Sequence, residues 1–496
     1  MPSAIVAIIT LVSVGLGFML LGIVHAYKNK HTITKSGLTL ENYISARDSV
    51  GPILGTATLV ATVMGTWILF SPAETATFAG VIGLAGYAFG SAAPILVLIP
   101  VGIRLRSLMP QGHSLTEYVL LRFGNTTYIF ALMVMIFYMF VFISAELTAI
   151  GLAVQLISGV PLYVTVLIIG ITTLLYTTYG GLKAAIFTDG IQFIFIIPLL
   201  LIVLIKSITG LDGITNIIKT TNAVNPELIS YSHYLGWETG IALIIGILAA
   251  NMFHQGYWQR IYSSRNEATI KISFIASAIL VVPIVFISGL FGIMAIGFGI
   301  IDNPSTSLFS VVKEIMPSMA LFVLILAIIL VMSSVDSLLN GLVSSFTSDL
   351  RQIKKNLPVK TLLNYARLVT IVIACLAMLV AVQGYSVLYL FLVADLIAAA
   401  MAVPLFLGLY ISRYNGTVVI LSTIVGFVAG ILYFPGPDFT GWVDIPKAGS
   451  LMISFFNALV FSTVTAFACT CYRMKPFNFN NLRKLVRIIE DKNLTK

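Results

Sequence analysis

Hydrophobic residues along this chain gather in long runs, separated by short segments rich in charge, Gly or Pro. A helical run of about 18 or more apolar residues can cross the roughly 30 Å of hydrocarbon in a bilayer. The pattern therefore predicts an all-α polytopic membrane protein with about 13 transmembrane helices. The predicted spans lie near residues 3–26, 52–79, 81–107, 126–157, 161–180, 189–209, 236–258, 271–301, 317–349, 362–381, 385–410, 416–434 and 449–473.

The composition excludes several classes of protein. Of the 496 residues, 58% are hydrophobic and only 9% are charged, which is too little polar surface for a soluble enzyme. The net charge of +9 would indicate nucleic-acid binding only on a soluble basic domain, and the pattern predicts none. Cys375, Cys469 and Cys471 lack metal-ligand spacing, so we expect no resident cofactor.

The basic residues predict the orientation. The first apolar run, Ile5 to Val24, has no basic segment before it and is long for a signal peptide, so we interpret it as a retained span with its N-terminus outside. With that orientation, 24 of the 28 Lys and Arg residues face inward, and four face outward: Lys206, Lys219, Lys313 and Lys447. Because cytoplasmic loops carry an excess of Lys and Arg, we expect a cell-membrane protein with a cytoplasmic C-terminus.

Two predicted spans carry interruptions. Gly65 and Ser71-Pro72 interrupt the second span, and a polar passage from Asn251 to Gly256 interrupts the seventh. These spans lie five apart and so run in opposite directions, like corresponding helices of the inverted repeats in secondary transporters. The alternative is coincidence, because Gly and Pro are common in membrane helices.

A single transporter domain over residues 1–496 follows from this pattern. The two repeats would cover residues 51–209 and 236–410. Residues 1–50 add a span and a cytoplasmic loop, and residues 411–496 add further spans and a basic tail that we expect near anionic lipid. A monomer is the simplest assembly.

Five carboxylates fall within or at the edge of predicted spans, with almost no Lys or Arg at the same depth: Glu74, Glu146, Asp189, Asp336 and Asp395. A carboxylate in hydrocarbon must be protonated, hydrated or paired with a cation. We interpret a transported cation or a proton as that partner. Alternatives stay open: Asp189 can cap its helix or pair with Lys183, and Glu146 and Asp395 can be protonated packing residues.

One serine passage favours Na⁺ as the cation. Ser333, Asp336 and Ser337 share a helix face, and Ser334 lies beside them. Hydroxyl, carboxylate and carbonyl oxygens suit Na⁺ better than a soft metal. The alternative is that these serines bond only to their own helix.

Polar and aromatic residues at the two interruptions are candidates for contact with a solute. His254 and Gln255 can contact a solute or cap the interrupted helix, and Trp258 can instead be an interfacial anchor. The candidate solute residues are Gly65, Trp67, Glu74, Glu146, His254, Gln255 and Trp258.

Four passages resemble the sodium/solute symporter family of proline permeases and of sugar, sialate, pantothenate and urea transporters. The resemblance covers about residues 40–410. The passages are Glu41-Asn42-Tyr43 with Gly51-Pro52, Tyr179-Gly180-Gly181-Leu182 leading to Thr188-Asp189-Gly190-Ile191-Gln192, Tyr257-Trp258-Gln259-Arg260, and Met332-Ser333-Ser334-Val335-Asp336-Ser337.

The resemblance implies a leucine-transporter-type core of five plus five inverted helices with an added N-terminal span. It also implies a sodium site at Ala61, Met64, Leu330, Ser333 and Ser334. A second cation site or exit path would involve Asp189, Asp336 and Ser337.

The chain departs from the family pattern at two positions. Val63 stands where proline permeases have an aspartate, and Asp336 replaces a hydroxyl of members that bind two sodium ions. The passage from His254 to Arg260 looks more like urea transporters than sugar symporters.

The sequence therefore predicts a sodium-coupled symporter that imports a small polar organic solute, such as proline or urea, by alternating access. A small carboxylate also stays open as the solute. The alternatives are proton coupling through Asp336 or Asp189, and a solute sensor without net transport. A channel is disfavoured because no selectivity-filter repeat is present.

Overall fold

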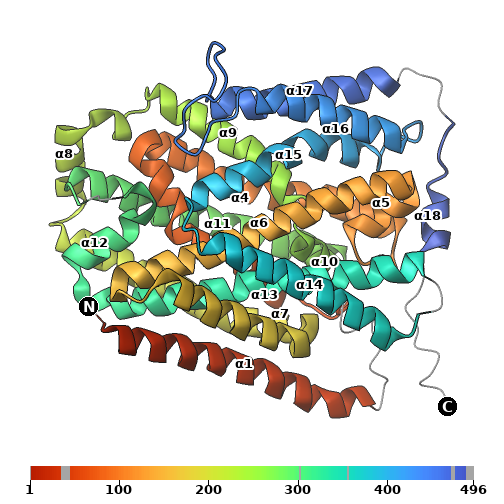
Figure 1. Ribbon diagram of the computed structural model, residues 1–496, viewed down its shortest axis with the longest axis horizontal. Coiled ribbons are helices and arrows are strands. Elements are labelled where there is room, and N and C mark those ends of the chain that lie inside the picture. The colour runs from red at the N-terminus through yellow and green to blue at the C-terminus, as the bar shows by residue number, and fades with distance from the viewer. Residues whose placement is uncertain (1, 35–44, 301–302, 355–356, 471–474, 487–496) are drawn as a thin grey trace.

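The computed structural model describes residues 2–34, 45–300, 303–354, 357–470 and 475–486. Over these ranges the chain is a bundle of helices (Figure 1), and its β-structure is limited to two isolated bridges. The predicted all-α fold class is confirmed.

The helices follow one another in this order: α1 (Ala4–Thr34), α3 (Pro52–Val63), η1 (Thr66–Leu69), α4 (Ser71–Leu108), α5 (Leu115–Phe123), α6 (Asn125–Ser158), α7 (Leu162–Gly210), α8 (Ile214–Val224), η2 (Pro226–Ile229), α9 (Tyr234–Asn251), α10 (Gln255–Ser263), α11 (Glu267–Gly297), η3 (Pro304–Thr306), α12 (Ser307–Ile315), η4 (Pro317–Met319), α13 (Ala320–Ile353), α14 (Val359–Ala381), α15 (Val387–Leu407), α16 (Gly416–Ile431), α17 (Leu451–Thr470) and α18 (Asn480–Leu485).

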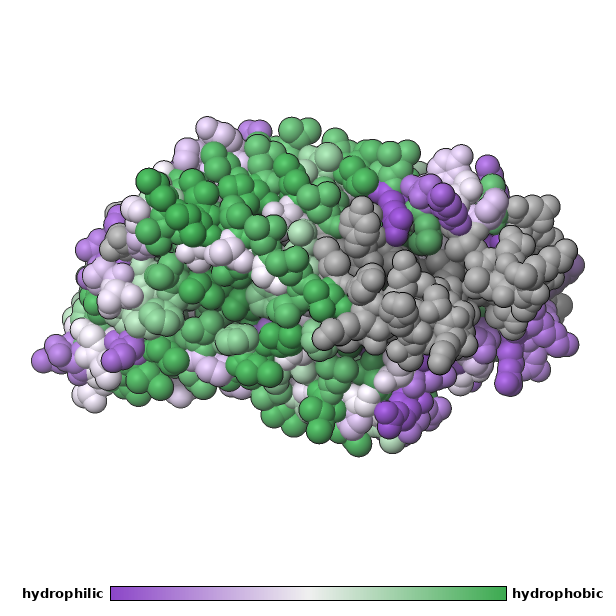
Figure 2. Space-filling view, turned by 90° about the horizontal axis from the view of Figure 1, so that it is seen from below, coloured by the Kyte–Doolittle hydropathy of each residue, from purple (hydrophilic) through white to green (hydrophobic). Residues whose placement is uncertain are grey.

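The apolar helices of the described chain match the predicted spans in place. Ten are long and apolar enough to cross a membrane, and three shorter ones cover Pro52–Val63, Leu162–Leu175 and Gly416–Ile431. Figure 2 shows hydrophobic residues between polar ends on the face that it displays. Such a face is unfavourable in water and suits lipid.

The peripheral helices frame the bundle. α1 packs against α7 and α13 along one edge, and α16 and α17 pack together along the opposite edge (Figure 1). α1 begins at the end of the molecule where α8 and α12 lie, and α18 lies at the other end. The interrupted helices lie between these edges.

The first interruption separates α3 from α4. α3 starts with Pro52 in its first turn, where a missing amide hydrogen leaves no bond unmade. Met64 and Gly65 are extended, and the chain resumes as η1 before α4 begins at Ser71-Pro72. The break therefore lies where Gly65 and Ser71-Pro72 predict it.

The second interruption separates α9 from α10. α9 ends at Asn251, and His254 caps α10 because its ring Nδ1 accepts a hydrogen bond from the amide of Gly256 at 3.0 Å. The capping alternative for His254 is thus the arrangement in the structure.

A short backbone bridge ties the two interrupted helices together at one end. The amide of Val50, before α3, donates to the carbonyl of Ser263 at 2.9 Å, and the amide of Arg265 donates to the carbonyl of Val50 at 2.9 Å. The start of α3 and the end of α10 are therefore held side by side.

Gly80 marks the boundary between the second and third predicted spans. α4 runs through both spans, but Gly80 has the non-helical angles φ 60° and ψ −159°. A Cβ atom at this position would lie 2.2 Å from the carbonyl oxygen of Leu228. Only glycine combines a left-handed φ with such a close approach.

Two further predictions concern a predicted boundary between spans and passages outside the described residues. Helical backbone continues through Gly180-Gly181 in α7, which contains both the fifth and sixth predicted spans. Glu41-Asn42-Tyr43 and residues 487–496 of the basic tail lie outside the described residues, and α18 is the helix within the described part of the tail.

Gly80→Ala is expected to destabilise the protein by about 2 kcal/mol or more, because a left-handed alanine is strained and its Cβ meets Leu228. Thermal midpoints of detergent-purified protein measure this. Gly17→Ala in α1, where a Cβ atom meets nothing within 4 Å, is the matched control. Equal midpoints for both variants would contradict the role given to Gly80.

Candidate functional site

The carboxylate of Glu146, on α6, binds the first interruption. Its Oε2 accepts hydrogen bonds from the amide of Thr66 at 2.7 Å and from the hydroxyl of Ser334, on α13, at 2.9 Å. Its Oε1 accepts from the amide of Trp67 at 3.5 Å. Glu146 thus supplies acceptors that the broken helix lacks, in a place without water to do so.

Gly65 makes room for this carboxylate. A Cβ atom on residue 65 would lie 2.0 Å from Oε1 of Glu146. Gly65, a candidate solute residue, therefore has a packing reason to be glycine.

A second group of polar side chains surrounds Asp189, which is fully buried. Its Oδ2 accepts from the hydroxyl of Thr58 at 2.6 Å and from Nη2 of Arg260 at 2.8 Å. Its Oδ1 lies 2.7 Å from the hydroxyl of Ser333. Ser337 lies 3.1 Å from Nη2 of Arg260 and 3.3 Å from the hydroxyl of Thr62. We call these six residues the Asp189 cluster: Thr58, Thr62, Asp189, Arg260, Ser333 and Ser337.

Arg260, one of the 24 basic residues predicted to face inward, is buried to 2% exposure as the partner of Asp189. The expectation of a carboxylate without a base is therefore wrong for Asp189. Removing one partner of a buried ion pair leaves a charge uncompensated, which destabilises by about 3–5 kcal/mol.

The residues predicted for the sodium site lie where α3 passes α13. The hydroxyl of Ser333 lies 2.9 Å from the carbonyl oxygen of Ala61, and Met64 follows at the break. The hydroxyl of Ser334 lies 3.1 Å from the carbonyl of Leu330 and faces Glu146. The two adjacent serines therefore join two different polar groups.

The residues predicted for a second cation site separate into two places. Asp189 and Ser337 both belong to the Asp189 cluster. Asp336 accepts a hydrogen bond from Nδ2 of Asn340, one turn further along α13, at 2.7 Å.

The remaining candidates lie around the interruptions in different roles. Glu74 accepts from the hydroxyl of Ser386 at 3.0 Å and lines an outer cavity. Gln255 donates to the carbonyl of His113, and Trp258 donates to the carbonyl of Met252 and stacks on Phe406. Of the candidate solute residues, Trp67 lines the central cavity.

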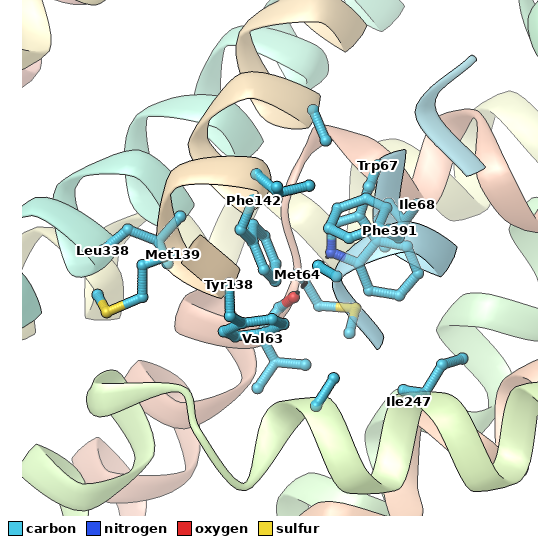
Figure 3. Close-up of a cluster of buried hydrophobic side chains, with 14 of the residues drawn as sticks. Val63, Met64, Trp67, Ile68, Tyr138, Met139, Phe142, Ile247, Leu338 and Phe391 are labelled. Carbon is cyan, nitrogen blue, oxygen red and sulfur yellow. Dashed lines mark hydrogen bonds between the residues drawn. The ribbon is translucent and has the colours of Figure 1, made fainter. Parts of the chain in front are cut away.

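The central cavity lies beside the first interruption and is narrow, with about 30 Å³ open to the centre of a water-sized molecule. Figure 3 shows the rings of Trp67, Tyr138, Phe142 and Phe391 gathered around Val63 and Met64. The cavity is lined by Val63, Trp67, Tyr87, Ser91, Tyr138, Phe142, Leu243, Ile247, Asn251, Leu388, Phe391, Leu392 and Asp395.

Sequence reasoning missed most of this wall and part of the Asp189 cluster. Thr58 and Thr62 are spaced one helical turn apart on a largely apolar helix, which is a signal that a helical projection could have found. Tyr138, Phe142 and Phe391 carry no such signal, because aromatic residues are ordinary in membrane helices.

The fold and the site together define a helical membrane transporter with two interrupted helices and a buried polar group where the first of them crosses α13. The sequence profile of the Sodium:solute symporter family matches residues 43–426. The chain belongs to this family.

Individual relatives agree with this membership. The chain is 28% identical over 387 residues to the spermidine transporter DUR31 of Candida albicans, over 76% of this chain and 72% of that protein. It is 24% identical over 458 residues to the osmoregulated proline transporter OpuE of Bacillus subtilis, over 85% and 88%.

A solved structure agrees on the fold. The substrate-bound outward-open structure of a Na⁺-coupled sialic acid symporter superposes with a TM-score of 0.75 at 18% identity, covering 95% of this chain and 99% of that one. The resemblance drawn from the sequence motifs and the leucine-transporter-type fold are confirmed.

The Asp189–Arg260 pair predicts non-additive effects on stability. Arg260→Met and Asp189→Asn should each lower the thermal midpoint in detergent, because each leaves the other residue buried without its charge partner. The double variant should be more stable than Arg260→Met alone. Losses that simply add would contradict the pairing.

Proposed function

We propose that this chain imports a small polar organic solute together with Na⁺ by alternating access. The observation that carries the proposal is the meeting of the Ala61 carbonyl and the Ser333 hydroxyl beside Asp189, where the interrupted helix passes α13. Membership of the Sodium:solute symporter family supports the same activity. The family and its relatives are transporters rather than enzymes.

The ion would bind at the backbone and hydroxyl oxygens of the crossing. In the proposal these come from Ala61, Met64, Leu330, Ser333 and Ser334. A second cation site or exit path would use Asp189, Asp336 and Ser337. Carbonyl, hydroxyl and carboxylate oxygens form the hard donor set that Na⁺ prefers, which supports this assignment.

Arg260 has a defined part in this proposal. With no ion bound, its guanidinium supplies the positive charge that a buried Asp189 requires. An arriving Na⁺ would bind beside Ser333, whose hydroxyl already contacts the carboxylate of Asp189. The ion and Arg260 would then both balance the charge of that carboxylate. Asp189 would then remain compensated both with and without the ion.

Coupling follows from differential affinity. Na⁺ can favour the outward-open state only if it binds that state more tightly, and its binding then completes the solute site. Moving one Na⁺ inward supplies about 2.3 kcal/mol per 100 mV of membrane potential, which concentrates a neutral solute by tens of fold.

The placement in the cell is also proposed. The chain is a multi-pass membrane protein, and we assign it to the cell membrane with its N-terminus outside and its C-terminus in the cytoplasm. The opposite positions of the start of α1 and of α18 support this topology (Figure 1). An amino acid such as proline, or urea, is the candidate solute from the sequence. The names of two relatives give proline again and spermidine in addition.

Uptake into proteoliposomes tests the ion site. Ser333→Ala/Ser334→Ala is expected to raise the Na⁺ concentration that gives half-maximal solute uptake by about tenfold or more. The reason is that both hydroxyls at the crossing are lost. Ser454→Ala/Ser462→Ala removes two buried hydroxyls on the peripheral helix α17 and is the matched control.

Two outcomes would contradict the proposal. An unchanged Na⁺ dependence in the Ser333/Ser334 double variant would remove the ion site. Uptake that persists without Na⁺ and collapses with a protonophore would assign the coupling to protons.

A further inference from the structure

The central cavity contains a carboxylate, Asp395, that has no hydrogen-bond or ion-pair partner among the described residues. Asp395, on α15, lines the cavity and is 4% exposed. No group in the described part of the chain makes a hydrogen bond or ion pair with it. Glu146 and Asp189, by contrast, are each bound by several partners. A buried carboxylate of this kind is protonated, hydrated or paired with a cation, and the cavity gives an entering cation direct access to Asp395.

Aromatic rings form much of the wall around this carboxylate. Trp67 stacks on Tyr87 with ring centroids 5.6 Å apart, and Phe391 meets Trp67 edge-on at 6.2 Å. Phe142 meets Phe391 at 4.8 Å and Tyr138 at 5.8 Å (Figure 3). Ring faces attract organic ammonium groups. A bare inorganic cation instead needs a shell of oxygen atoms. Eight of the thirteen lining residues have no side-chain oxygen, and the other five are Tyr87, Ser91, Tyr138, Asn251 and Asp395.

The cavity also lacks the features that would hold an anion. None of its thirteen lining residues, all within the described chain, is Lys, Arg or His. In transporters of this fold the amides of an interrupted helix can bind an anionic substrate group. Here the amides of Thr66 and Trp67 are already bound by Glu146.

The outer cavity carries the same sign. Glu74 and Glu238 line it, and one basic residue, Lys447, lies there as well. Glu74 is held by Ser386, the N-cap of α15, and Asp395 lies nine residues further along that helix. A helical rise places Ser386 and Asp395 about 13.5 Å apart along the α15 axis. α15 is therefore associated with one carboxylate of each cavity, Glu74 at the outer cavity and Asp395 at the central one.

We propose that the solute is an organic cation with an amine or quaternary ammonium group, which pairs with Asp395 between the rings of Trp67, Tyr87, Tyr138, Phe142 and Phe391. This inference rests on the proposed function and names its substrate class. It disfavours carboxylates, and it chooses for Asp395 between the two roles that the sequence left open, a partner for a cation and a packing residue.

Transport by purified protein in proteoliposomes tests the inference, with labelled spermidine, putrescine, choline, proline and urea as probes. The wild type should accumulate an amine cation. Asp395→Asn should lower kcat/KM for that amine by about tenfold or more, because the only facing charge is lost. Asp395→Glu should restore part of it. Asp438→Asn, which removes an exposed carboxylate, is the matched control and should leave uptake unchanged.

A second measurement uses only the wild type, so it tests the inference even if the Asp395 variants do not fold. Binding to the wild type is followed by the thermal midpoint in detergent, with choline compared with its neutral carbon analogue 3,3-dimethyl-1-butanol and spermidine tested alongside. One of the cations should raise the midpoint, and the neutral analogue should not. Transport currents give the total charge moved per solute, and Na⁺ fluxes give the number of Na⁺ ions moved per solute. The total charge should be larger by the charge of the solute itself.

The outcomes separate the two proposals. Na⁺-driven accumulation of only proline or urea, unaffected by Asp395→Asn, would overturn the organic-cation assignment and leave symport intact. Stabilisation by the neutral analogue equal to that by choline would overturn it too. Uptake of an amine that depends on Asp395 but not on Na⁺ would support the assignment and contradict sodium coupling.

Discussion

A helix that is interrupted inside a bilayer leaves backbone amides and carbonyls unpaired where no water can bind them. In this chain the carboxylate of Glu146 meets that requirement by accepting from the amide of Thr66 and the hydroxyl of Ser334. The same bonds join α6, the first interruption and α13. The positions of the ion crossing and of the aromatic cavity both follow from this arrangement, because each is built on residues next to the break.

The buried carboxylates differ in how their charge is balanced, and the difference assigns them different work. Asp189 is paired with Arg260, whose guanidinium balances its charge inside the bundle. Glu146 is surrounded by donors and serves the backbone. Asp395 lines a cavity and accepts no hydrogen bond from the described residues, which leaves it available to a solute.

The sequence predicted the parts of the fold that depend on local pattern. Hydrophobic runs located the spans, and Gly65, Ser71-Pro72 and the passage from Asn251 located both interruptions, because chain breaks require particular residues. Pairing across helices was beyond that reasoning. Arg260 is a basic residue at the end of a predicted span, where such residues are usually topology signals. Only the packing of α10 against α3 and α13 brings it to Asp189.

The aromatic cavity is a second feature that the sequence pattern could not predict. Phe142 and Phe391 are separated by some 250 positions in the chain and meet only because α6 and α15 pack together. A hydrophobic ring in a membrane helix faces lipid, core or cavity with the same sequence signature. The function of Asp395 depends on which of these surrounds it, so it could not be assigned before the helices were placed.

The backbone bridge between Val50 and Ser264 has a mechanical consequence. It couples α3, which carries the Ala61 carbonyl, to α10, which carries Arg260. Any tilt of one half-helix would therefore move the other, so the Ala61 carbonyl and the Arg260 guanidinium would move together. Asp189, on α7, lies outside this bridged pair of helices, so such a tilt would change its distances to both groups at once.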